Sequence, residues 1–128
     1  MHNPPMISGR RLVLFAAAAA LIGCGSTDDN RPPQWSFISS TIIQPQCATV
    51  NCHSEVAQRA GVDLHDRESG YASLVTRNFT APVDSMGNSA LYHLLTGNGA
   101  LRMPPDGPLP MVDIDLINEW IKAGANNN

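Results

Sequence analysis

Residues 47–53 read Cys-Ala-Thr-Val-Asn-Cys-His and form the most chemically specific stretch of the chain. Two thiols stand five positions apart, and an imidazole directly follows the second thiol. Thiols and imidazoles are ligands for soft and intermediate metals, whereas two thiols in an oxidising compartment can instead form a disulfide. The stretch therefore indicates either a cofactor or metal site or a structural disulfide.

A haem-attachment reading explains the histidine as well as the cysteines. The usual c-type attachment signature is Cys-x-x-Cys-His, and here four residues rather than two separate the cysteines. The wider gap only enlarges the loop between two thioether bonds, because Cys52 and His53 remain adjacent. We therefore expect one covalent haem c, attached through Cys47 and Cys52, with His53 as the proximal iron ligand.

The second axial ligand is expected further along the chain. Met103 lies fifty residues beyond His53, followed by Pro104 and Pro105. A thioether is a soft ligand that favours reduced iron, and the two prolines remove N–H donors from a wall that would face an apolar haem. His65 and His93 remain alternative distal ligands, and either would give a bis-histidine iron of lower potential.

At these residues the chain resembles the small bacterial c-type cytochrome domains, including the group called planctomycete-type cytochrome C. The resemblance covers residues 37–125 and implies a covalent haem, His53 proximal, Met103 distal, and first and last helices packed together. The chain departs from the family at residues 83–88, where a Pro-Gly-Asp-Pro turn is common, so the path of this loop stays open. Besides the cysteine motif, the matching elements are Gly61-Val62-Asp63-Leu64, Tyr71-Ala72-Ser73-Leu74-Val75, Ser89-Ala90-Leu91-Tyr92, Met103-Pro104-Pro105 and Trp120-Ile121-Lys122-Ala123-Gly124-Ala125.

Apolar spacing around the motif predicts an all-α domain over residues 36–126, with three to four short helices and long loops. By resemblance this is a cytochrome c-like domain around one haem. The first helix is expected to have Ser36 as N-cap and to stop or bend at Pro45. A second starts near Asp66, and a third runs from Ser89 to Thr96. The positions expected on one face of each helix are Phe37, Ile38, Thr41 and Ile42 in the first helix, Tyr71, Leu74 and Val75 in the second, Leu91, Leu94 and Leu95 in the third, and Met111, Ile114, Ile117, Trp120 and Ile121 in a fourth.

The amino-terminal segment predicts export and lipid anchoring. Arg10 and Arg11 precede a run of twelve weakly polar residues, which is too short to span a bilayer. Leu21-Ile22-Gly23-Cys24 resembles the bacterial lipobox, so residues 1–23 read as a lipoprotein signal peptide with Cys24 as the lipidated residue. Residues 24–35 follow as the lipidated cysteine and a polar, flexible tether. Gly25 after the cysteine favours the outer membrane, on the periplasmic side of the cell envelope.

Length and charge narrow the function classes. The 128 residues accommodate one domain, and the formal charge of −3 becomes −5 once the segment with Arg10 and Arg11 is removed. No basic surplus favours a nucleic-acid partner. The mature chain holds few aromatic residues, so we expect its core to be underfilled without a bound group.

The leading hypothesis is a membrane-tethered, single-haem c-type cytochrome that passes one electron at a time between redox protein partners outside the cytoplasm. It is an electron carrier and not an enzyme. The alternative is a disulfide-bonded envelope lipoprotein that acts as a binding or structural module without haem. Two further possibilities are a haem enzyme or sensor with an open sixth position, and a zinc site made by the cysteine motif and a second histidine.

Overall fold

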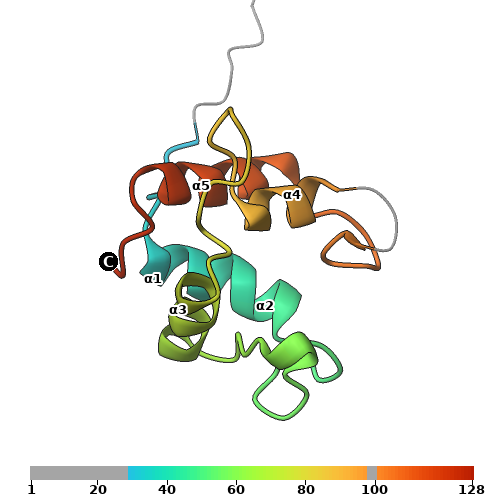
Figure 1. The fold of residues 1–128 in the computed structure, drawn as a ribbon. Coiled ribbons are helices and arrows are strands. Elements are labelled where there is room, and N and C mark those ends of the chain that lie inside the picture. Colours follow the sequence, from blue (N-terminus) through green and yellow to red (C-terminus); the bar gives the residue numbers. More distant parts are fainter. Residues whose placement is uncertain (1–28, 98–100) are drawn as a thin grey trace, which may run out of the picture.

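The computed structural model describes residues 29–97 and 101–128, so the predicted signal peptide and Cys24 lie outside the described residues. In this part of the chain every named element is helical, and the β-type pairing is confined to one isolated bridge between Pro82 and Ser89. The all-α prediction is therefore confirmed. Figure 1 shows the first helix lying between α4 and α5 on one side and α3 on the other.

The first helix is continuous but irregular. It consists of α1 (Trp35–Ile38), a π-helical stretch η1 (Ser39–Ile43) and α2 (Gln44–Cys47). The helix does not stop at Pro45, because the wider π turns directly precede the proline and the regular helix resumes with the proline in its first turn. This continuation delivers Cys47 at the last position of α2.

The prediction that Ser36 caps this helix is wrong. The helix already begins at Trp35, with Gln34 as an extended N-cap whose side chain makes no capping bond. The first N–H groups of the helix are instead bound by Asn128, the last residue of the sequence. Its side-chain oxygen accepts the Trp35 N–H at 2.9 Å, and its main-chain oxygen accepts the Ser36 N–H at 2.9 Å. A contact across the whole chain length therefore satisfies helix donors that a local cap usually serves.

The next two helices begin close to the predicted positions, and a side chain caps the start of each. In α3 (Arg67–Thr76), the Asp66 carboxylate accepts the Ser69 N–H at 2.8 Å. In α4 (Ala90–Thr96), the Ser89 hydroxyl accepts the Tyr92 N–H at 3.1 Å. Gly97 ends α4 in an extended conformation, and a Cβ at this position would lie only 2.8 Å from the His93 carbonyl oxygen. A short helix η2 (Arg59–Gly61) precedes α3.

The last helix, α5 (Met111–Lys122), provides most of one core face. Its predicted apolar stripe is buried except at Met111, which is 56% exposed because it stands in the first turn, at the helix end. The prediction is therefore wrong for Met111, and it missed Leu116, which is buried. The described helix contacts are α1 with α3 and α5, and α4 with α5. The first and last helices meet through Trp35 and Trp120, whose stacked rings lie 4.9 Å apart.

The loop at residues 83–88 is organised by one carboxylate. Asp84 accepts hydrogen bonds from the backbone N–H groups of Met86 and Asn88, each at 2.9 Å, and from the Asn88 side chain at 2.9 Å. A fourth contact joins Asp84 to His93 Nε2 of α4 at 2.8 Å. The path of this loop, which the resemblance does not predict, is thus set by contacts with the exposed side of α4.

Candidate functional site

A cavity of about 360 Å³ lies beside the helical core. Its walls come from the end of the first helix, the loop that carries Cys52 and His53, α3, α4 and the segment 103–105. The wall is almost entirely apolar, and Arg59 supplies its cationic side chain. A volume of this size is typical of a site for a small molecule or cofactor.

Four predicted site residues line this one cavity: Cys47, Cys52, His53 and Met103. Met103 belongs to the segment between α4 and α5, and Figure 1 shows this segment on the same side of the fold as the loop that follows α2. The backbone N–H of Met103 donates to the Leu94 carbonyl at 2.9 Å. The Leu94 carbonyl lies in the last turn of α4, where a carbonyl has no hydrogen-bond partner within the helix. The bond therefore holds the Met103 segment against α4 at the cavity wall.

The His53 ring is oriented by backbone groups. Its Nδ1 lies 3.2 Å from the Val62 carbonyl oxygen, and the His53 carbonyl accepts the Leu64 N–H at 2.8 Å. A carbonyl can only accept, so this contact requires the proton on Nδ1 and leaves Nε2 as the nitrogen with a free lone pair. This is the arrangement in which a histidine binds a metal through one nitrogen while the other is held by a neighbouring acceptor.

The two cysteines stand at the ends of a compact turn and are not joined by a disulfide. The Cys52 N–H donates to the Thr49 carbonyl at 2.9 Å, and the His53 N–H donates to the Cys47 carbonyl at 3.2 Å. Burial, together with the neighbouring Cys52, raises the pKa of Cys47 to about 11, so Cys47 is a neutral thiol at pH 7. The four intervening residues are therefore accommodated as a hydrogen-bonded loop.

Arg59 is a wall residue that the sequence analysis did not single out. Its Nε donates to the Asn51 carbonyl at 2.6 Å, and its backbone N–H donates to the Cys52 carbonyl at 3.0 Å. Both bonds hold the turn between the cysteines. Phe79 also lines the cavity and was likewise missed. Neither residue belongs to a motif, so the sequence carries no signal for them.

The two alternative distal ligands, His65 and His93, do not line the cavity. His65 places its two ring nitrogens 2.8 Å from Asp63 and Asp66, and His93 contacts Asp84. The imidazole nitrogens that could bind iron are thus engaged with carboxylates elsewhere, whereas Met103 faces the cavity.

A zinc site is not supported. Within residues 29–97 and 101–128, no group of three or more His, Cys, Asp or Glu side chains is arranged to hold a metal ion. A haem differs in this respect, because the porphyrin provides four ligands and the protein needs to supply only the axial ones.

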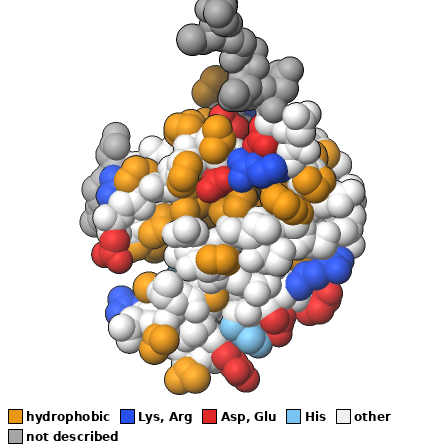
Figure 2. Space-filling view, turned by 180° about the vertical axis from the view of Figure 1, so that it is seen from behind, with side chains coloured by type: hydrophobic (Ala, Val, Ile, Leu, Met, Phe, Trp, Pro, Cys, Tyr) orange, Lys and Arg blue, Asp and Glu red, His pale blue; other side chains and the backbone are white. Residues whose placement is uncertain are grey.

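The face of the molecule drawn in Figure 2 carries side chains of both charges. On the face drawn in Figure 2, acidic and basic side chains of the described residues are interspersed with apolar ones, without a broad basic patch. In the described part of the chain, no helix is long and apolar enough to cross a membrane.

No protein-family model, curated protein or solved structure matches this chain. The resemblance to c-type cytochrome domains therefore depends on the quoted residues of the sequence.

Proposed function

We propose that this protein is a single-haem c-type cytochrome with a cytochrome c-like fold that carries one electron at a time between redox proteins. The observation that carries this proposal is the convergence of Cys47, Cys52, His53 and Met103 on one apolar cavity, although Met103 is fifty residues from the motif. A disulfide between the cysteines would account for neither the oriented imidazole nor the Met103 segment.

Each residue has a defined role in this proposal. Cys47 and Cys52 would hold the haem through thioether bonds, and His53 Nε2 and Met103 Sδ would be the protein ligands of its iron. The bound haem supplies a site that gains and loses one electron reversibly. The apolar walls around it exclude water, and the thioether of Met103 favours the reduced iron.

The proposed setting is the cell envelope, with the protein anchored through lipids on Cys24 at the periplasmic side of the outer membrane. Lipid chains hold a small domain at a membrane surface without a membrane-spanning helix. The mature charge of −5, with Lys122 as the only lysine, favours a redox partner that presents basic groups.

The proposal is tested by producing the full chain in a bacterium that matures other c-type cytochromes. We expect a red protein whose pigment survives acid-acetone extraction and whose intact mass includes both lipid and haem. Cys47→Ser/Cys52→Ser should be colourless, whereas Cys24→Ser should keep the haem and lose the lipid. A colourless wild-type protein would overturn the proposal in favour of the haem-free lipoprotein.

A second variant tests the distal ligand. Met103→Ala should lower the midpoint potential by about 59 mV or more, which is a tenfold change in a one-electron equilibrium. It should also abolish the Met–iron absorption feature near the red end of the spectrum. Met111→Ala is the matched control, because Met111 is exposed on α5. Rapid binding of carbon monoxide by the reduced wild-type protein would instead indicate an open sixth position.

A further inference from the structure

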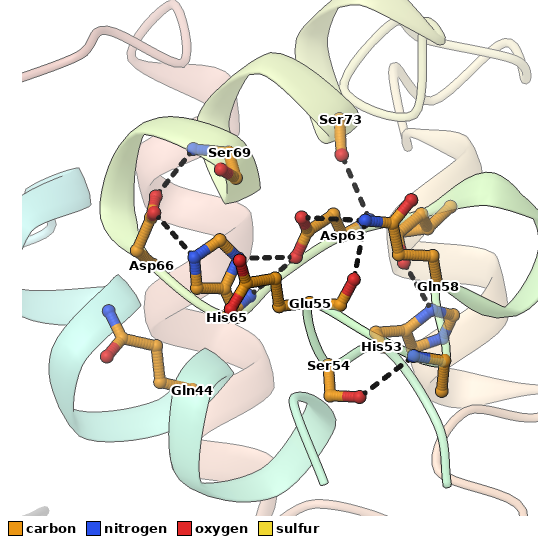
Figure 3. Close-up of polar contacts among 12 residues, drawn as sticks. Gln44, His53, Ser54, Glu55, Gln58, Asp63, His65, Asp66, Ser69 and Ser73 are labelled. Atoms are coloured by element: carbon orange, nitrogen blue, oxygen red, sulfur yellow. Dashed lines mark hydrogen bonds and ion pairs between the residues drawn. The ribbon is translucent and has the colours of Figure 1, made fainter. Parts of the chain in front are cut away.

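Outside the cavity, a histidine is held between two carboxylates. His65 Nδ1 lies 2.8 Å from Asp63 Oδ1, and His65 Nε2 lies 2.8 Å from Asp66 Oδ2. Figure 3 shows the His65 ring between these two side chains, with His53 on the other side of Asp63. We call Asp63, His65 and Asp66 the clamp.

The pKa shifts of His65 and Asp66 favour the charged forms of both side chains. The hydrogen bond to Asp63 is the main cause that raises the pKa of His65, and the neighbouring Asp66 and Glu55 charges act in the same direction. The hydrogen bond from the Ser69 N–H is the main cause that lowers the pKa of Asp66. The imidazolium and carboxylate forms therefore stabilise one another, and Asp66 also fixes one side of the clamp to the start of α3.

The other side of the clamp belongs to the segment that orients His53. Residues 62–64, which we call the strap, contact His53 at both ends: Val62 accepts from the ring, and Leu64 donates to the main chain. Asp63 is the middle residue of the strap. Its N–H donates to the Ser73 hydroxyl of α3 at 3.1 Å, and its Oδ2 accepts from Gln58 at 3.2 Å.

We infer that the clamp fixes the strap against α3 and thereby sets the orientation and basicity of His53, so that Asp63 and His65 are positioning residues for the proposed proximal ligand. The inference rests on the proposed haem site. A hydrogen bond from Nδ1–H to a carbonyl raises the basicity of the metal-binding nitrogen, and a more basic ligand favours ferric iron. Loosening the strap therefore raises the midpoint potential.

The substitution His65→Ala distinguishes a positioning role of His65 from a purely electrostatic one, because the two roles change the midpoint potential in opposite directions. Loss of a nearby positive charge would lower the midpoint potential, because the field would then favour the more oxidised iron. Loss of positioning raises it. We expect the potential of His65→Ala to rise by an amount equivalent to up to about a tenfold change in the redox equilibrium, or 59 mV for one electron.

Two controls match this variant. His93→Ala removes an exposed histidine that contacts a carboxylate but not the strap, and its potential should equal that of the wild type. Glu55→Gln removes a negative charge near His65, so electrostatics alone should raise its potential slightly, and the rise in His65→Ala should be larger. His65→Gln keeps a donor toward Asp63 and should restore most of the wild-type potential.

The midpoint potential is measured by spectroelectrochemistry on the haem-loaded, full-length variants. In the reduced proteins, NMR measures the exchange of the His53 Nδ1 proton with water, which should become faster by about tenfold in His65→Ala. A potential that stays constant or falls in His65→Ala, with haem attached, overturns the positioning role. Absence of haem from the wild type instead overturns the proposed function, so the two failures are distinguishable.

Discussion

At one end of the domain Trp35, Tyr71 and Trp120 pack against one another, whereas at the other end a cavity separates α4 from the cysteine loop. Each aromatic polar atom at the closed end has a main-chain acceptor at 2.9 Å: Arg67 for Trp35, Ala125 for Tyr71 and Asn126 for Trp120. We call this group the aromatic cluster. In the aromatic cluster, side chains pack directly against one another. At the cavity end, apolar side chains instead surround the cavity.

The comparison shows how a chain with few aromatic residues is organised. Both tryptophans lie where the first and last helices of the domain meet, since Trp35 begins the first helix and Trp120 lies near the end of the last. The cavity end is lined mainly by aliphatic residues, together with Phe79, Arg59, Gln46 and the four proposed haem-binding residues. The described cavity therefore lies at the end of the domain away from both tryptophans.

The largest expected effect comes from breaking the aromatic cluster. Trp120 is 1% exposed, and Trp120→Ala should reduce the free energy of unfolding by about 3–5 kcal/mol, because a large void replaces a packed ring and the Asn126 carbonyl loses its donor. Denaturant unfolding measures this loss. Met111→Ala on the same helix is the control and should change stability by less than about 0.5 kcal/mol. Similar losses for both variants would contradict the cluster's dominant role.

Preventing haem attachment should affect the opposite end. In Cys47→Ser/Cys52→Ser, we expect hydrogen-exchange protection in α4 to fall by at least about tenfold, equivalent to about 1.4 kcal/mol, because its cavity face has no packing partner. Protection in α5 around Trp120 should fall less. Equal loss in both helices would mean that the two ends do not differ in their dependence on the bound group.

The sequence predicts those features of the two ends that depend on residues close together in the chain. The starts of α3 near Asp66 and of α4 near Ser89, and the apolar stripe of α5 except at Met111, follow from short-range rules, and the structure has them. The sequence also nominated the four residues that line the cavity, because the cysteine motif and the Met-Pro-Pro segment have recognisable chemistry.

The missed features depend on contacts between distant residues. Asn128 caps the first helix across the whole chain, Arg59 holds the cysteine loop, and Asp63 with His65 fixes the strap beside His53. The continuation of the first helix through Pro45 also needs the π turns of η1, which no local pattern indicates. These features depend on which segments of the chain meet in the fold. The spacing of residues within one segment does not predict such contacts.

A smaller effect is expected from the cap of α4. Ser89→Ala should cost about 1 kcal/mol, since the Tyr92 N–H loses its acceptor at a fully buried position. Because α4 lines the cavity, the loss of exchange protection should be concentrated in this helix and not in the aromatic cluster. Ser89→Thr, which keeps a hydroxyl, is the matched control. A loss spread evenly over the domain would show that the cavity end does not open separately.

The smallest effect is a local acid transition on the outer side of α4. Hydrogen bonds from the Asn88 backbone and side chain, followed by His93 and Met86, lower the pKa of Asp84 to about 2. Since the folded pKa lies below the ordinary value of 3.8, the stabilisation is present above that value and is lost as the pH falls through about 2.

NMR shifts of the Met86 and Asn88 amides should therefore change with a midpoint near pH 2, because a protonated Asp84 is a weaker acceptor. Asp84→Asn is the control and should lack this transition. Tryptophan fluorescence should stay constant through the same step, since Trp35 and Trp120 bond to main-chain carbonyls that do not titrate. If fluorescence and amide shifts changed together, acid would be unfolding the closed end along with the loop, and the two ends would form one cooperative unit.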